Sequence, residues 1–299
     1  MIKRTLFFSN PAYLSTKNKQ LVINYPEKDK KTKTVPIEDI GILILENQQI
    51  TITNGLLSML IKNKAAIINC DAYHLPVSML QPLVGHSEQT ERIKWQLDAS
   101  IPLKKSLWQQ TINAKIINQA SFLEQRGTPI QKMKKWAAEV KSGDTENHES
   151  RAAVYYWKHI FGLDNFTRGQ KENAPNNLLN YGYAILRGIT ARALVSSGML
   201  PSVGIFHKNK YNAYCLADDI MEPYRVYVDI LVNDIVQSRE PYEEMTSSLK
   251  MNLLQLPTMN VIINKSHSPL MVAMSRTTNS LYECFTGKSR KLLYPVYEY

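Results

Sequence analysis

Residues 85–99 read GHSEQTERIKWQLDA, and the pattern of the whole chain changes at this point. Before Gly85 the apolar residues form short segments, whereas from Ser87 onward they recur at the spacing of an α-helix. A chain that passes from a run of strands to a run of helices is typical of the α+β class. The sequence therefore predicts a β-rich, sandwich-like domain over residues 1–82 and an all-helical domain over residues 83–299.

Short apolar or alternating segments, many of them rich in β-branched residues, fill the N-terminal part. The predicted strands cover residues 5–8, 12–15, 20–24, 34–36, 42–45, 50–52, 65–69 and 74–80. A short helix that Asn54 caps and that runs to Lys62 interrupts them. The charged segment EKDKKTK, residues 27–33, is expected to form a hairpin tip, whose lysines keep a strand edge solvated more readily than they bind a ligand.

Helical periodicity governs the rest of the chain. The predicted helices cover residues 92–99, 102–125, 130–141, 145–157 and 176 to about 197, and another begins near Tyr214. Lys132, Lys134 and Lys135 precede Trp136, an arrangement that suits either contact with a phosphate backbone or a packed indole beside extended lysine stems. Arg187 and Arg192 have the same two interpretations, phosphate contact or packing.

The composition of the 299 residues fits a folded protein that binds a polyanion. Apolar residues make up 44% and charged residues 21%, which is ordinary for a globular chain long enough for two domains. The 36 Lys and Arg residues exceed the 26 Asp and Glu residues and give a net charge of +10. This excess favours nucleic acid, although charge alone does not separate DNA from RNA or from an acidic protein.

Cysteine usage and hydropathy point to the cytosol. The three cysteines, Cys70, Cys215 and Cys284, form no C-x-x-C pair, which argues against a disulfide framework and fits a reducing compartment. The start, MIKRTLFFSN, is too short and too polar for a signal peptide, and no apolar run approaches the ~20 residues that a membrane span needs. The sequence therefore predicts a cytoplasmic protein without a membrane segment.

Residues 204–229 read GIFHKNKYNAYCLADDIMEPYRVYVD and concentrate chemically active side chains. One histidine and three acids fall within sixteen residues: His207, Asp218, Asp219 and Glu222. On the helix predicted here, Asp218 and Glu222 share a face and Asp219 lies on the other flank of Glu222. An imidazole with carboxylates suits Mn²⁺ or Mg²⁺, and neither thiolates nor a second histidine at helical spacing supports zinc. The alternative is a set of solvated helix-start acids beside a loop histidine.

A further carboxylate lies far upstream, in TENHESRAAVYYW, residues 145–157. Glu149 and Glu146 stand three residues apart near the start of a predicted helix, where the helix dipole stabilises acids in any case. On spacing alone, Glu149 is a capping or surface acid more often than a metal ligand.

Three stretches taken together carry a family resemblance: ESRAAVYYW at 149–157, NNLLNYGYAILR at 176–187 and GIFHKNKYNAYCLADDIMEPYR at 204–225. In this order and spacing they resemble the CRISPR-associated adaptation endonuclease and integrase, the Cas protein numbered one, in its type II branch. The resemblance covers nearly the whole chain and implies that the helical domain is the catalytic one. Many members have a second histidine where this chain has Phe206, so only His207 is matched.

The resemblance implies a metal site and a reaction. The family's metal-binding glutamate, histidine and acid map onto Glu149, His207 and Glu222, while Asp218 and Asp219 match acids that serve as ligands or neighbours in other branches. The implied enzyme is a Mg²⁺- or Mn²⁺-dependent DNA endonuclease and integrase of CRISPR adaptation, which joins spacer DNA 3′-ends to the repeat array by transesterification. A water nucleophile in place of the 3′-hydroxyl would make the same site a nuclease.

The resemblance also implies partners. These are double-stranded DNA of spacer and CRISPR repeat, a second copy of the chain in a homodimer formed through the β-rich domain, and the small second adaptation protein, the Cas protein numbered two. Participation of the type II effector nuclease is left open. Two alternatives stay open as well, a catalytically inactive DNA-binding scaffold and an unrelated metal-dependent RNA nuclease. The presence of Glu149 and Glu222 argues against the first, and the lack of an RNA-binding sequence motif argues against the second.

Overall fold

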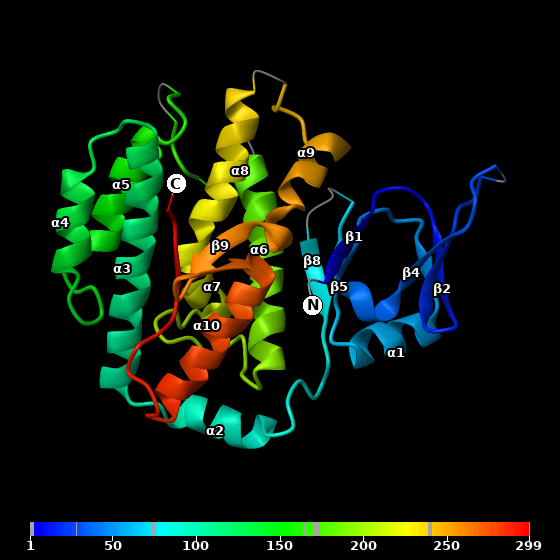
Figure 1. Cartoon of the computed structure of the whole chain (residues 1–299), viewed down its shortest axis with the longest axis horizontal. Helices are drawn as coiled ribbons and strands as arrows, with labels where there is room; N and C mark the ends of the chain where they lie inside the picture. Colours follow the sequence, from blue (N-terminus) through cyan, green and yellow to red (C-terminus); the bar gives the residue numbers. More distant parts are fainter. Residues whose placement is uncertain are drawn as a thin grey trace. The chain divides into compact units, whose positions relative to one another are not determined.

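A computed structural model describes residues 3–27, 29–72, 76–163, 166–169, 174–238 and 241–298. The chain divides into two compact units, Met1–Ser87 and Glu88–Tyr299. Strands form most of the first unit and helices most of the second, so the predicted α+β class is confirmed (Figure 1). Of the predicted strand 74–80, residues 74 and 75 lie outside the described residues, as does Lys28 in the predicted hairpin tip. No helix in the described ranges is both long and apolar enough to cross a membrane.

The first unit contains two four-stranded sheets. One sheet has the order β1-β5-β7-β8 and consists of β1 (Arg4–Phe8), β5 (Ile40–Leu45) and β7 (Ala66–Cys70) in parallel, with β8 (Pro76–Leu80) antiparallel to β7. The other has the order β4-β3-β2-β6, in which β2 (Tyr13–Lys17), β3 (Gln20–Asn24) and β4 (Lys33–Pro36) are antiparallel and β6 (Thr51–Ile52) is parallel to β2. The strands therefore follow the predicted segments closely.

Helix α1 (Asn54–Lys62) packs with both sheets around one buried cluster. Leu14 from β2, Leu43 from β5 and Leu56 from α1 all belong to this cluster. The helix cap differs from the prediction, because Thr53 and not Asn54 is the N-cap. The Thr53 backbone is extended, and its hydroxyl accepts a hydrogen bond from the Leu56 backbone N–H at 3.4 Å.

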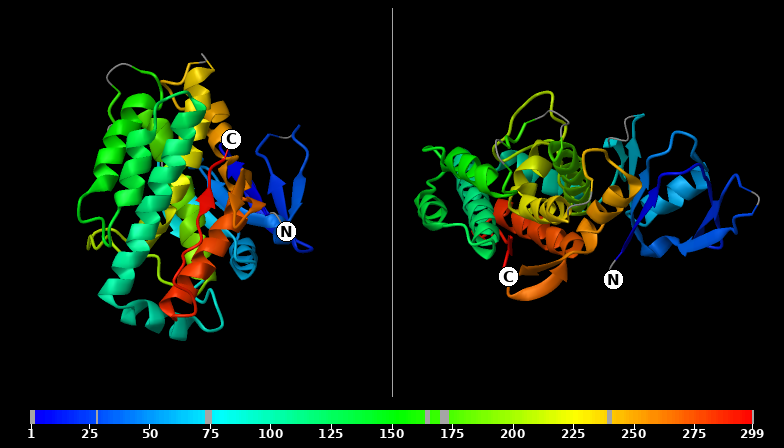
Figure 2. Two further views of the ribbon diagram at one scale, coloured as in Figure 1. Left: turned by 60° about the vertical axis from the view of Figure 1, so that its left-hand side comes forward. Right: turned by 90° about the horizontal axis from the view of Figure 1, so that it is seen from above.

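The second unit contains helices and one small sheet. The helices are α2 (Gln89–Asp98), α3 (Ile101–Gln125), α4 (Gln131–Glu139), α5 (His148–His159), α6 (Asn176–Ser196), α7 (Cys215–Met221), α8 (Arg225–Gln237), α9 (Ser247–Leu253) and α10 (Leu270–Phe285), with 3₁₀ turns η2 (Glu222–Tyr224) and η3 (Leu256–Thr258). Helix α6 packs against α7, α8, α9 and α10 and lies in the middle of this unit (Figure 1 and Figure 2).

The small sheet is a feature that the prediction of an all-helical second domain left out. Its order is β10-β9-β11, with β9 (Asn260–Ile263), β10 (Ser266–Pro269) and β11 (Pro295–Val296). Asn264 and Lys265 both have positive φ, 49° and 60°, as a two-residue hairpin turn between β9 and β10 requires. This turn contains no glycine, so the sequence carries only a weak hairpin signal.

Helix α6 and helix α8 approach each other closely at Gly182. A Cβ atom built on Gly182 would lie 2.4 Å from Val228 Cγ1, well inside a normal contact. The absence of a side chain at this position therefore sets the spacing of the two helices. This spacing matters for the site described below, because the residues that precede α8 belong to it.

Replacing Gly182 by alanine should destabilise the protein by about 1–3 kcal/mol, the usual cost of overpacking a closed core. Chemical denaturation would measure the loss. Gly55→Ala in α1 is the matched control, because its Cβ would meet only Thr16 Cγ2 at 3.7 Å, an ordinary contact. That control should be neutral or stabilising by up to about 1 kcal/mol, since alanine is the better helix former. Wild-type stability of the Gly182→Ala protein would contradict the close approach of α6 and α8.

Candidate functional site

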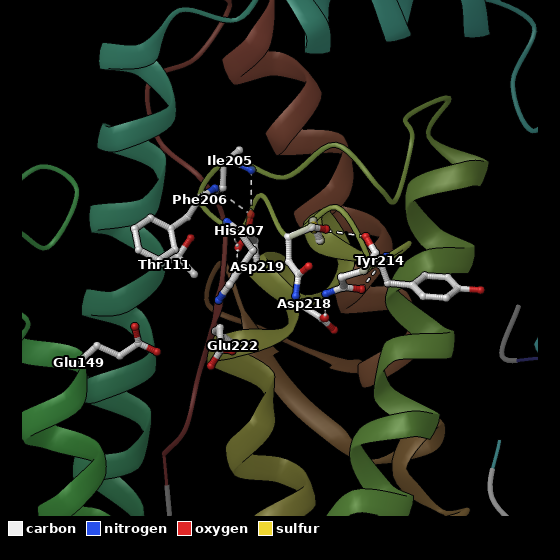
Figure 3. Close-up of polar contacts among 12 residues, drawn as sticks. Thr111, Glu149, Ile205, Phe206, His207, Tyr214, Asp218, Asp219 and Glu222 are labelled. Carbon is white, nitrogen blue, oxygen red and sulfur yellow. Dashed lines mark hydrogen bonds and ion pairs between the residues drawn. The ribbon is translucent and has the colours of Figure 1, made fainter. Parts of the chain in front are cut away.

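Three predicted site residues come from three separate elements of the second unit. Glu149 is in the first turn of α5, His207 is in the loop between α6 and α7, and Glu222 follows the last residue of α7. Figure 3 shows their side chains turned toward the same region. Glu149 does not cap its helix: Asp144 does so, by accepting hydrogen bonds from the backbone N–H groups of His148 at 2.9 Å and Glu149 at 3.0 Å. The Glu149 carboxylate is thereby left to reach across to α3.

Lys115 of α3 lies between the two glutamates. Its Nζ atom is 2.6 Å from Glu149 Oε1 and 2.7 Å from Glu222 Oε2. Two carboxylates from segments 73 residues apart thus converge on one ammonium group. Sequence analysis missed Lys115, although a signal existed: the lysine occupies the buried face of α3, one position from Ile116 and three from Ile112.

Lys115 and Glu222 both stay charged although they are buried. Burial alone lowers the pKa of Lys115, but the neighbouring charges of Glu222 and Glu149 raise it above its ordinary value, so the amine stays protonated. Burial likewise raises the pKa of Glu222, and Arg225 together with Lys115 outweighs this and lowers it. Arg225 Nη2 lies 2.9 Å from Glu222 Oε1. Glu222, whose side chain is only 5% exposed, is therefore an ionised carboxylate between two cations.

A single buried carboxylate holds the His207 loop in place. Asp219 Oδ2 accepts hydrogen bonds from the backbone N–H groups of Ile205 at 2.7 Å and Phe206 at 2.9 Å. Asp219 Oδ1 accepts from the His207 backbone N–H at 3.2 Å and from His207 Nδ1 at 2.5 Å (Figure 3). A Cβ on Gly204 would lie 2.8 Å from Asp219 Oδ2 and 2.4 Å from the His207 carbonyl oxygen, so this tight loop requires glycine.

The contact with Asp219 also fixes the chemistry of the imidazole. With Nδ1 bonded to Asp219, the other ring nitrogen, Nε2, is the one left to act on a ligand. The hydrogen bond to Asp219 raises the pKa of His207, partly opposed by burial, and Glu222 and Glu149 add to the rise.

The Asp218 carboxylate is paired with residues other than Lys115 and His207. Its Oδ1 atom accepts from Arg187 Nε at 2.6 Å, and its Oδ2 atom accepts from Asn212 Nδ2 at 2.7 Å. Asp218 lies in α7, whereas Glu222 follows its last residue, Met221, and opens a 3₁₀ turn. Asp219, predicted on the other flank, is the acid that contacts His207.

A buried network connects α5, α6 and α8 behind the site. Asp229 accepts hydrogen bonds from the hydroxyl groups of Tyr156, at 2.9 Å, and Tyr183. Burial raises the pKa of Asp229 to about 6, although both tyrosine donors act in the opposite direction. The guanidinium of Arg225 lies 4.8 Å from the centre of the Tyr183 ring. The helices that carry Glu149 and Arg225 are thus fixed relative to each other.

The donor set fits a hard divalent cation in its chemistry, and Lys115 stands at the place where the carboxylates meet. Two carboxylates and an imidazole are ligands that Mg²⁺ and Mn²⁺ accept. Glu222 Oε2 is buried, and the Lys115 ammonium lies 2.7 Å from it, so a cation already stands at the oxygen that a metal would bind. In the part of the chain that the structure describes, no group of three His, Cys, Asp or Glu side chains forms a ready-made cation site. A metal would therefore have to take the place of the Lys115 ammonium.

Comparison with known proteins identifies the family. The family model described as CRISPR associated protein Cas1 matches residues 6–254. The CRISPR-associated endonuclease Cas1 of Neisseria meningitidis serogroup C (strain 8013) is 36% identical over 295 residues, which cover 98% of this chain and 95% of that protein.

Two solved structures share the fold. A casposase bound to integration product has a TM-score of 0.77 at 20% sequence identity and covers 98% of this chain and 92% of its own. A Cas6-RT-Cas1–Cas2 complex has a TM-score of 0.73 at 18% identity and covers 97% of this chain and 35% of its own. At these identities the likeness establishes the fold alone. The match over most of the sequence and the relative of 36% identity go further: this chain belongs to the Cas1 family of CRISPR-associated proteins.

Proposed function

We propose that this chain is the integrase and nuclease of a CRISPR adaptation system and joins the 3′-ends of spacer DNA to a CRISPR repeat by metal-dependent transesterification. One observation carries the proposal: Glu149 and Glu222 meet at one buried cation, and the His207 side chain is turned toward the same region (Figure 3). The name of the Neisseria relative, an endonuclease, and the integration product held by the casposase support the reaction class.

Glu149, His207 through Nε2, and Glu222 would hold the metal, Mg²⁺ or Mn²⁺. When bound, such an ion neutralises charge on the reacting phosphodiester and makes the attacking oxygen more acidic. A DNA 3′-hydroxyl at that position gives integration, and water gives hydrolysis. The rest of the DNA is expected to lie on basic side chains of this chain, whose net charge is +10.

The surrounding residues have positioning roles in this proposal. Asp219 orients His207 and so presents Nε2 to the site. Arg225 binds Glu222 Oε1, and Lys115 connects Glu222 Oε2 to Glu149 Oε1. Lys115 pairs with both carboxylates and holds them close together. Preorganised ligands of this kind lower the cost of assembling a metal site.

The proposed partners follow from the family. The Cas6-RT-Cas1–Cas2 complex contains a Cas2 component, and we propose that this chain binds the corresponding small adaptation protein and double-stranded DNA. We further propose a β-rich domain, residues 1–82, that forms a homodimer, and a catalytic domain, residues 83–299. Participation of a type II effector nuclease and a cytoplasmic location stay predictions.

A catalytically inactive DNA-binding scaffold is the second candidate function, and Lys115 favours it. An ammonium held at 2.6 and 2.7 Å by both carboxylates is a stable arrangement that needs no metal. The two candidates differ in whether a divalent ion displaces Lys115, and variants of the site separate them.

His207→Ala should abolish strand transfer and nicking while DNA affinity and melting temperature stay nearly unchanged. Losing one of three ligands should slow the reaction by far more than ~10-fold, the effect of about 1.4 kcal/mol on the barrier. The assay is joining of a labelled 3′-hydroxyl duplex to a CRISPR repeat plasmid with Mn²⁺ or Mg²⁺ and the small partner. His267→Ala, an exposed histidine on β10, is the matched control and should react at the wild-type rate. Wild-type joining by His207→Ala would defeat the proposed mechanism.

Lys115→Met should destabilise the protein by about 3–5 kcal/mol in the presence of a chelator, because the buried Glu222 and the half-buried Glu149 then lose their shared cation. Adding Mn²⁺ should restore much of this loss and should raise the melting temperature of the variant more than that of the wild type. Lys134→Met is the control: its exposed pair with Glu124, at 3.1 Å, is worth at most about 1 kcal/mol. If Mn²⁺ stabilises neither the wild type nor Lys115→Met, the site holds no metal and the scaffold is the better conclusion.

A further inference from the structure

Phe206 is a large, exposed apolar side chain next to His207, the proposed metal ligand. It precedes His207 directly, and 45% of its surface is exposed. The residues that follow, Lys208 and Lys210, are exposed cations. The site needs Phe206 for none of the roles described above, since only its backbone N–H takes part, as a donor to Asp219.

Trp108 of α3 covers one face of the Phe206 ring. The two ring centres are 4.2 Å apart and their planes differ by 2°, so the rings are stacked in parallel. Trp108 is completely buried, and its Nε1–H has no hydrogen-bond partner among the described residues. Burying that donor without a partner costs free energy, so stacking and packing, not a hydrogen bond, hold the indole there.

The His207 ring lies beside this stack and not on top of it. Its plane is 85° from that of Phe206 and 85° from that of Trp108, and its centre is 5.3 Å and 5.6 Å from theirs. A ring on the outer face of Phe206 would be much farther from Trp108 than from Phe206. Nearly equal distances therefore place His207 at the edges of both rings. No ring in the described part of the chain covers the opposite face of Phe206.

The stacked pair of Phe206 and Trp108 is held rigidly. The Phe206 backbone is fixed by Asp219, which also binds Ile205 and His207, and its ring points from the loop toward α3 (Figure 3). A rigid aromatic face costs little conformational entropy when a ligand stacks on it. A single ring among polar neighbours is too small for a protein interface. Its size fits one planar group.

We propose that the outer face of Phe206, backed by Trp108, stacks the unpaired nucleobase next to the reacting phosphodiester. Every nucleobase presents a flat π-face, and Lys208 and Lys210 can meet the adjoining phosphates. An unpaired base offers an open face for stacking, whereas a base inside a duplex already has neighbours on both faces. It belongs to the reacting nucleotide or an immediate neighbour, since Phe206 lies 5.3 Å from the His207 ring. This inference rests on the proposed function, which supplies the DNA.

The test uses the full chain, a chelator to prevent reaction, and 2-aminopurine as a fluorescent base. The probe is placed in turn at the unpaired 3′-terminal nucleotide of a spacer duplex, at the repeat nucleotide beside the cut, and in the duplex interior. Stacking on Phe206 should quench one of the first two probes, and which one is quenched tells whether the donor or the target base is bound. The interior probe should not respond.

Phe206→Leu should remove that quenching and weaken binding of the unpaired end by about 5- to 150-fold, which corresponds to the ~1–3 kcal/mol of one stacked base. Phe206→Tyr should keep both, and all variants should bind a blunt, fully paired duplex equally. Tyr211→Leu is the matched control, because Tyr211 is 84% exposed on the same loop but stacks on no ring in the described structure. It should behave as the wild type.

Equal quenching in Phe206→Leu and wild type at both positions would overturn the inference, and so would an equal loss of affinity for the blunt duplex. The joining assay with the wild type and His207→Ala tests the proposed reaction separately from the stacking site. If the quenching depends on Phe206 but the wild type joins no DNA, the stacking site is supported and the proposed integrase activity is wrong. If the wild type joins DNA but no quenching depends on Phe206, the integrase activity is supported and the stacking site is wrong.

Discussion

Repulsion between two carboxylates is the constraint around which the second unit is organised. Glu149 and Glu222 are brought to one place that is largely shielded from water, where like charges cannot both stay ionised without compensation. Lys115 and Arg225 supply that compensation, and each approaches a different oxygen of Glu222. The lysine comes from the middle of α3, and the arginine opens α8. The packing of α3, α5 and α8 thus has an electrostatic reason as well as an apolar one.

The three acids of the sequence LADDIMEPYR perform three different tasks. Asp219 satisfies three backbone N–H groups and the His207 ring, Asp218 pairs with Arg187 and Asn212, and only Glu222 faces the carboxylate of Glu149 through Lys115. Gathering all three on one cation would leave the loop donors and Arg187 without partners, at a cost for each lost bond. The neighbouring acids therefore have different partners, because each of the polar groups around them must be satisfied.

Local patterns predicted the fold well and the site only in part. Alternation and helical spacing located the strands of the first unit and long helix α3, because these signals lie within a few residues. The β9–β10 hairpin was missed since its turn, Asn264 and Lys265, carries no glycine. The family resemblance supplied Glu149 and Glu222. Spacing could not identify Lys115, which meets acids 34 and 107 residues away, nor could it tell Asp218 from Asp219 once Pro223 changes the helix.

An internal cation also changes what a metal would contribute. In small zinc domains the metal supplies much of the folding free energy, because the site does not form without it. Here Lys115 already neutralises the carboxylates, so the helical unit needs no metal to bring them together. Under the proposed function, the ion and the ammonium then compete for the same oxygens. A DNA phosphate close enough to attract Lys115 would weaken its hold on the glutamates and favour the ion, and linkage requires the ion to favour DNA equally. The charge balance that stabilises the folded site would thereby make metal binding depend on the substrate.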